Sequence, residues 1–139
     1  MRVSLRKRNR LLWFLGLTSI ILLLDQVFKG TFTTGAICNK GFALGIGEIS
    51  FFIPLLVLVA VLFLVYLEKI RLNIIALTLI FAGGVSNLLD RFIVGCVRDF
   101  ISIFSFPSFN LADVAITLGV IFIAYSFVNA SLRSKTNEI

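Results

Sequence analysis

Two aspartates near the end of the chain, Asp99 and Asp113, could do acid–base chemistry together if the segment between them folds back. Two carboxyl groups a few ångströms apart cannot both ionise readily, so they share one proton. One of them can then activate a water molecule while the other protonates the carbonyl oxygen under attack. Such a pair hydrolyses amide bonds without a metal ion or a histidine.

The other common catalytic groups are scarce. The chain has no histidine, which removes Ser-His and Cys-His nucleophile systems and most zinc sites. Its two cysteines, Cys38 and Cys96, are too few for a thiolate metal cluster. A disulfide between them is one interpretation, but we favour two free, half-buried cysteines that serve as small apolar residues. We therefore expect no metal and no cofactor, although paired carboxylates can also hold a divalent cation or relay protons in a transporter.

A second pair of charges ends the first apolar run. Asp25 and Lys29 are four residues apart, so they lie on one helix face and can form an ion pair. We interpret Asp25 as a structural support, with Lys29 extending its ammonium group to water.

Asp90 ends a later apolar run, where the negative end of the helix dipole disfavours a carboxylate. It therefore needs a partner, either Arg91 or Arg98. A guanidinium group held by Asp90 could use its remaining N–H donors to bind a substrate carbonyl or a lipid headgroup. For Arg91 and for Asn87, a structural role and a binding role are equally good interpretations.

The last run begins at Asn110, a good helix N-cap, and Asp113 falls in the first helical turn. A Ser-Lys peptidase is a weaker alternative, because neither Lys29 nor Lys40 has an evident buried environment that would make it a base. The candidate nucleophiles for it are Ser86, Ser102, Ser105 and Ser108.

Composition sets the class of protein that must position these groups. Hydrophobic residues make up 59% of 139 positions, charged residues 14%, and the mean hydropathy is +1.06. These values indicate an integral membrane protein. Apolar runs of near-spanning length, without residue-by-residue alternation, predict an all-α bundle of four transmembrane helices in a single domain, residues 1–139. The predicted helices are 11–28, 49–67, 72–89 and 111–130.

Basic residues predict the orientation. Nine of the thirteen lie in the N-terminal segment, in the turn between the second and third helices, and in the tail. Because cytoplasmic loops are enriched in Lys and Arg, we expect both termini inside and the aspartates at the outer face. The net charge of +6 then reflects topology and contact with membrane lipids, and we expect no nucleic-acid partner.

Five motifs in order resemble the lipoprotein signal peptidase family, the type II signal peptidases of bacteria. They are Asp25-Gln26 with Lys29, then 39–43, 83–91, 95–100 and 109–113. The resemblance implies an aspartic endopeptidase of the bacterial inner membrane that cuts a diacylglyceryl-modified prolipoprotein just before its lipidated cysteine.

The same resemblance implies residue roles. Asp99 and Asp113 would be the catalytic dyad; Asn39, Asn87, Arg91 and Asn110 would position the substrate and the dyad; Asp25, Lys29 and Asp90 would support the site. The implied fold adds a small extracytoplasmic β cradle and a short surface helix that closes over the site.

Two features depart from the family pattern. Only nine residues separate Lys29 from Asn39, so we expect a trimmed cradle that could lack its first strand, and Leu44 stands where an aromatic residue is common. Gly41, Gly45 and Gly47 suit a mobile outer segment. The alternatives from other classes are a non-catalytic lipoprotein-binding membrane protein and a small carboxylate-dependent transporter.

Overall fold

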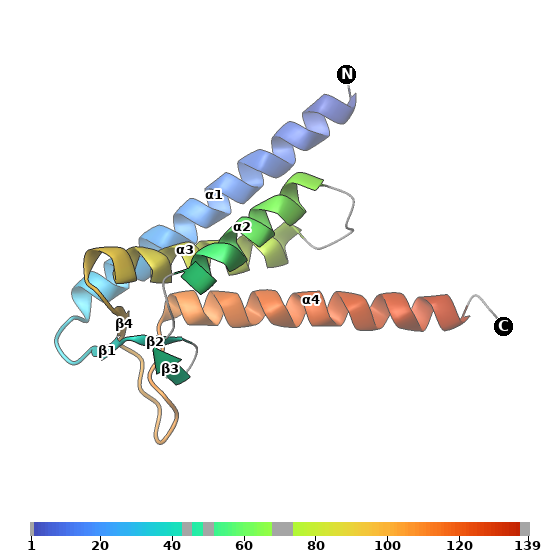
Figure 1. The fold of residues 1–139 in the computed structure, drawn as a ribbon. Coiled ribbons are helices and arrows are strands. Elements are labelled where there is room, and N and C mark those ends of the chain that lie inside the picture. The colour runs from blue at the N-terminus through green and yellow to red at the C-terminus, as the bar shows by residue number, and fades with distance from the viewer. Residues whose placement is uncertain (1, 43–45, 49–51, 68–73, 137–139) are drawn as a thin grey trace.

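The computed structural model describes residues 2–42, 46–48, 52–67 and 74–136, and it is mostly helical (Figure 1). Short strands gather at one end of the molecule, and both chain termini lie toward the opposite end. The helices are α1 (Arg2–Thr31), α2 (Phe52–Leu67), α3 (Ile74–Ile93) and α4 (Leu111–Thr136).

Three of these helices are long and apolar enough to cross a membrane, over Arg8–Thr31, Ile74–Ile93 and Leu111–Asn129. The described part of α2 has 16 residues, so this criterion does not show a fourth span. Residues 49–51 and 72–73 of the predicted helices lie outside the described residues. The basic N-terminal segment continues α1 back to Arg2, and α3 runs three residues beyond Asp90.

Helix α3 lies at the centre and packs against α1, α2 and α4. Two glycines, Gly83 of α3 and Gly119 of α4, make the contact of α3 with α4 close, as small residues do in membrane bundles. A Cβ atom added at Gly83 would collide with the backbone oxygen of Ala112, and one at Gly119 would lie 2.7 Å from the backbone oxygen of Ala76. The backbones of α3 and α4 therefore approach closely at both positions.

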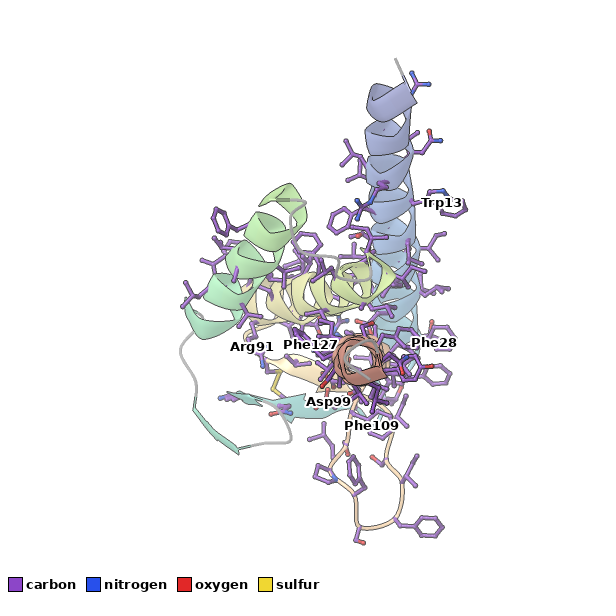
Figure 2. All side chains as sticks on the ribbon, turned by 90° about the vertical axis from the view of Figure 1, so that its right-hand side faces the viewer. Trp13, Phe28, Arg91, Asp99, Phe109 and Phe127 are labelled. Atoms are coloured by element: carbon purple, nitrogen blue, oxygen red, sulfur yellow. A yellow bond between two sulfur atoms is a disulfide. The ribbon has the colours of Figure 1, made fainter. Side chains whose placement is uncertain are left out.

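Apolar side chains on the outside of the bundle are exposed, as expected of a surface that meets lipid tails. Trp13 on α1 is 77% exposed and points away from the other helices (Figure 2).

Two small antiparallel sheets take the place of a larger cradle. Strand β1 (Ile37–Asn39) pairs with β4 (Val97–Asp99), and β2 (Gly41–Phe42) pairs with β3 (Ile46–Glu48). The shortened connection after α1 thus still leads directly into a strand. Gly41 and Gly47 belong to the second sheet, whereas Leu44 and Gly45 lie outside the described residues. Among the described residues, the helices are α1 to α4, without a separate short surface helix.

The preference for free cysteines was wrong. Cys38 and Cys96 form a disulfide, with their Cα atoms 5.5 Å apart. The β1–β4 pairing explains it, because Cys38 lies opposite Arg98 and Cys96 immediately precedes β4. The two cysteines are 58 positions apart in the sequence, and no local sequence pattern predicts that they meet.

Candidate active site

Asp99 is the last residue of β4, and its side chain is buried. Its Oδ2 accepts a hydrogen bond from Nδ2 of Asn39 at 2.9 Å, and its Oδ1 accepts one from Nδ2 of Asn110 at 2.6 Å. Asn39 lies opposite Val97 in the β1–β4 pairing, two residues before Asp99. Residues two apart on a strand share a face, so the sheet register brings Asn39 to Asp99.

The surroundings of Asp99 favour its protonated form. Burial raises the pKa of the Asp99 carboxyl group, and the negative charge of Asp113 raises it further. Hydrogen bonds from Asn39 and Asn110 act in the opposite direction because they stabilise the carboxylate, but they do not cancel the effect of burial. Asp99 therefore retains a proton more readily than an aspartate in water.

Asp113 is held in the first turn of α4 by reciprocal capping. Its backbone N–H donates to Oδ1 of Asn110 at 3.0 Å, and its Oδ2 accepts from the backbone N–H of Asn110 at 3.2 Å. This arrangement is the capping box of helix N-termini, with Asn and Asp in the two roles. The predicted N-cap at Asn110 is confirmed.

Asn110 connects the two aspartates. Its buried side-chain amide donates to Oδ1 of Asp99, while its backbone N–H holds Asp113. The segment between the aspartates folds back, because the backbones of Ile101 and Phe109 pair through hydrogen bonds of 2.9 and 3.0 Å. This fold-back brings both carboxyl groups to Asn110, one to its side chain and the other to its backbone, which supports the expected convergence.

Helix α3 contributes two further side chains. Asn87 Nδ2 donates to Oδ1 of Asp113 at 2.8 Å, and Asn87 Oδ1 accepts from Nδ2 of Asn110 at 3.2 Å. One turn later, Arg91 Nη1 donates to the backbone oxygen of Asn87 at 3.3 Å. The positive charge of Arg91 acts on both Asp113 and Asp99.

Beneath the site lies an ionic cluster formed by Asp25, Lys29, Asp90 and Arg98. Lys29 Nζ is 2.7 Å from Asp25 Oδ2 and 3.4 Å from Asp90 Oδ2. Arg98 Nη2 is 2.7 Å from Asp90 Oδ1, and hydrogen bonding to Asp90 raises the pKa of Arg98. Both the expected Asp25–Lys29 ion pair and the need of Asp90 for an arginine partner are confirmed.

The prediction that Lys29 extends its ammonium group to water was wrong. Its side chain is 0% exposed, because its ammonium group donates to Oδ1 of Asn87 at 2.9 Å in addition to its two ion pairs. The ammonium group of Lys29 is thus engaged by Asp25, Asp90 and Asn87. Ser86 likewise contacts Asp25, at 2.6 Å, rather than Lys29, so this geometry does not favour a Ser-Lys pair.

Gln26 is a part of this region whose role sequence reasoning missed. Its Nε2 donates to Oγ of Ser86 at 2.8 Å and to Oδ1 of Asp90 at 3.1 Å, and its Oε1 accepts from Nη2 of Arg98 at 3.0 Å. It thereby ties α1 to α3 and to the start of β4. A polar residue next to Asp25 within an apolar helix was the available signal.

The geometry provides two carboxyl groups in different settings, with amide donors fixing their orientation. Asp99 is buried between Asn39 of β1 and Asn110, whereas Asp113 is partly exposed at the start of α4. A shared proton and an activated water are the chemistry that such a pair supports.

Sequence comparisons identify related proteins. The family model of signal peptidase (SPase) II matches residues 12–129. The lipoprotein signal peptidases of Staphylococcus aureus strains JH9 and Newman are each 34% identical to this chain over 112 residues. These alignments cover 73% of this chain and 68% of each relative.

Two solved structures have the same fold. Both are described as a bacterial membrane enzyme determined by the in meso method. One gives a TM-score of 0.78 at 27% identity, covering 85% of this chain and 88% of its own. The other gives a TM-score of 0.71 at 27% identity, covering 82% and 91%. With the family match and the relatives from Staphylococcus aureus, these likenesses establish that the chain belongs to the signal peptidase II family.

Proposed function

We propose that Asp99 and Asp113 are the catalytic dyad with which this aspartic peptidase removes signal peptides from prolipoproteins. The activity follows from membership of the signal peptidase II family. The assignment of the two residues is supported by Asn110, which holds one carboxyl group through its side chain and the other through its backbone.

In the proposed reaction, the ionised carboxylate takes a proton from a water molecule, whose oxygen attacks the scissile carbonyl carbon. The protonated carboxyl group gives its proton to the carbonyl oxygen. Collapse of the tetrahedral intermediate then breaks the C–N bond as a proton moves to the leaving nitrogen. The products are a signal peptide with a new carboxylate and a lipoprotein with a new amino terminus.

The remaining site residues have positioning roles in this proposal. Asn39 and Asn110 orient Asp99, and Asn87 orients Asp113. Arg91 lies close enough for its charge to act on both carboxyl groups, and it would bind a substrate carbonyl or headgroup. Asp25, Lys29 and Asp90 support the site from within the ionic cluster.

The substrate is proposed to be a prolipoprotein already modified with diacylglycerol and cut just before the lipidated cysteine. Exposed apolar side chains on the spanning helices would let such a substrate approach from the bilayer. We also propose that α2 is a fourth span and that residues 1–139 form one domain. The non-catalytic and transporter alternatives are not favoured, because the family consists of signal peptidases.

The decisive experiment measures cleavage of a diacylglyceryl-modified precursor beside its unlipidated twin. Asp99→Asn and Asp113→Asn are each expected to lose turnover by orders of magnitude, because an amide can neither share the proton nor activate water. Thermal unfolding should stay close to that of the parent, and a chelator should leave the parent active.

Asp90→Asn is the matched control, since Asp90 is a buried aspartate of the ionic cluster rather than of the dyad. It should lower the unfolding temperature yet retain turnover below that temperature. Full activity in either dyad variant would refute the assignment.

A further inference from the structure

The segment 101–109, between β4 and α4, is a loop whose two ends pair with each other. The backbone pairing of Ile101 with Phe109 forms its neck, and the hydroxyl groups of Ser102 and Ser108 are 2.7 Å apart just beyond it. Phe104 at the tip has a φ of 48°, a left-handed conformation that is uncommon for a bulky residue.

The tip is apolar and exposed. Phe104 is 103% exposed, Phe106 56% and Ile103 48%. The sequence from Phe100 through Ala112 contains no charged residue. Loops that face water are usually polar, and grouped exposed apolar side chains mark a binding surface.

The direction of the loop indicates what covers the tip. In Figure 1 the loop leaves the bundle at the level of the first turn of α4, and in Figure 2, which looks along α4, it extends downward from Phe109, across the helix axis. Helix α4 is long and apolar enough to cross a membrane from Leu111 onward. A segment that projects across the axis of a spanning helix, at its end, runs along the membrane surface.

The neighbouring end of α1 has the same character. The rings of Phe28, Phe32 and Phe100 stack with centroids 5.8 to 6.2 Å apart, and Phe32 is 49% exposed. Because Phe100 belongs to this stack, the apolar loop adjoins the end of a helix that is long and apolar enough to cross a membrane.

We propose that the loop 101–109 is an interfacial anchor whose tip residues Ile103, Phe104 and Phe106 insert into the leaflet on the side of the candidate site. Because the loop joins β4 to α4, its contact with lipid sets the depth at which Asp99 and the start of α4 stand relative to the headgroups. This role does not depend on the catalytic assignment of Asp99 and Asp113.

The test places a single fluorescent residue at the tip. The chain has one tryptophan, so Phe104→Trp in a Trp13→Phe background reports on the loop alone. In phosphatidylcholine vesicles its emission should be blue-shifted relative to tryptophan in water, and lipids brominated near the headgroup end of the acyl chain should quench it. Lys40→Trp in the same background is the matched control, because Lys40 is an exposed charged residue beside the strands. It should show neither effect.

Each other outcome overturns the proposal. Emission typical of water that acrylamide quenches would place the tip in solvent. A blue shift that grows with the protein-to-lipid ratio, in fluorescence that brominated lipid does not quench, would indicate that a second copy of the chain covers the tip. Quenching that appears only after a lipidated precursor is added would make the tip a substrate contact. Phe106→Trp in the same background provides a second position if the first variant does not fold.

Discussion

Asn110 illustrates how one residue organises this site. Its side chain donates to Asp99 and accepts from the backbone of Asp113, and its own backbone N–H donates back to the Asp113 carboxylate. Capping the helix would require only the two hydrogen bonds between Asn110 and Asp113. The additional bond to Asp99 connects the helix start to the strand, which is why the two carboxyl groups have fixed relative positions.

The pH dependence of cleavage should respond to Asn39. Its hydrogen bond to Asp99 stabilises the carboxylate and so opposes the raised pKa of that group. Asn39→Ala should raise the Asp99 pKa further and move the pH–activity profile toward higher pH, because the carboxylate loses a hydrogen bond that stabilises it. The measurement is kcat against pH for the parent and the variant, with Lys40→Ala as a control on the same connection. A shift toward lower pH, or none, would contradict the assignment.

The raised pKa of Asp99 also affects folding stability. A carboxyl group whose pKa is higher in the folded protein contributes stability below its unfolded pKa, and that contribution disappears as pH rises through the folded value. Its ionisation therefore weakens the fold, in contrast to most surface carboxylates.

Lys29 should matter more for stability than for chemistry. Replacing it with Met leaves Asp25 without its 2.7 Å partner and removes one of the cations near Asp90, at a cost of about 3–5 kcal/mol for a broken buried pair. The unfolding temperature should fall strongly, and Asp25→Asn in the same protein should recover part of the loss. Selective loss of turnover with unchanged unfolding would instead implicate Lys29 in catalysis.

At the scale of elements, the close contact of α3 with α4 positions the proposed dyad. Asn87 reaches Asp113 from α3 because Gly83, one turn earlier, lets the backbone of α4 approach. The β1–β4 sheet does the same for Asp99 from the other side. The site is thus assembled at the meeting point of a helix pair and a strand pair.

Gly83→Ala should test this contact. The added Cβ would collide with the backbone oxygen of Ala112 and lie 2.8 Å from Cγ1 of Ile116, so the helices must separate. We expect a loss of about 1–3 kcal/mol in stability, as for other overpacked cores, together with reduced cleavage. Gly16→Ala is the control, since nothing lies within 4 Å of a Cβ at that position. Equal behaviour of the two variants in thermal unfolding and kcat would contradict the argument.

Local patterns in the sequence predicted much of this arrangement. The apolar runs indicated the helices, Asn110 was recognisable as a cap, and the four-residue spacing of Asp25 and Lys29 indicated their ion pair. The sequence could not show that Cys38 meets Cys96, or that Lys29 is enclosed rather than extended to water. Both depend on elements distant along the chain, since Asn87 and Asp90 of α3 surround Lys29 and strand pairing joins the cysteines.

At the scale of the whole molecule, charge and disulfide agree on an orientation. Basic residues concentrate near the termini, which lie toward the end away from the strands (Figure 1). The Cys38–Cys96 disulfide lies at the strand end, and disulfides persist in oxidising compartments outside the cytosol. Both observations support our proposal that the termini are cytoplasmic and that the site faces the extracytoplasmic side of the bacterial inner membrane.

Cysteine labelling of intact cells should test that orientation. Asn9→Cys and Thr34→Cys place thiols at exposed positions on α1 and in the turn before β1. A maleimide that cannot cross the membrane should label position 34 in intact cells and position 9 only after lysis. The reverse pattern would invert the proposed topology.

The disulfide also changes what a cut in this protein would do. Because it joins residues 38 and 96, the chain between them, including all of α2 and α3, forms a covalent ring. A protease that nicks this ring once releases no fragment, and the nicked protein would migrate as one band until the disulfide is reduced.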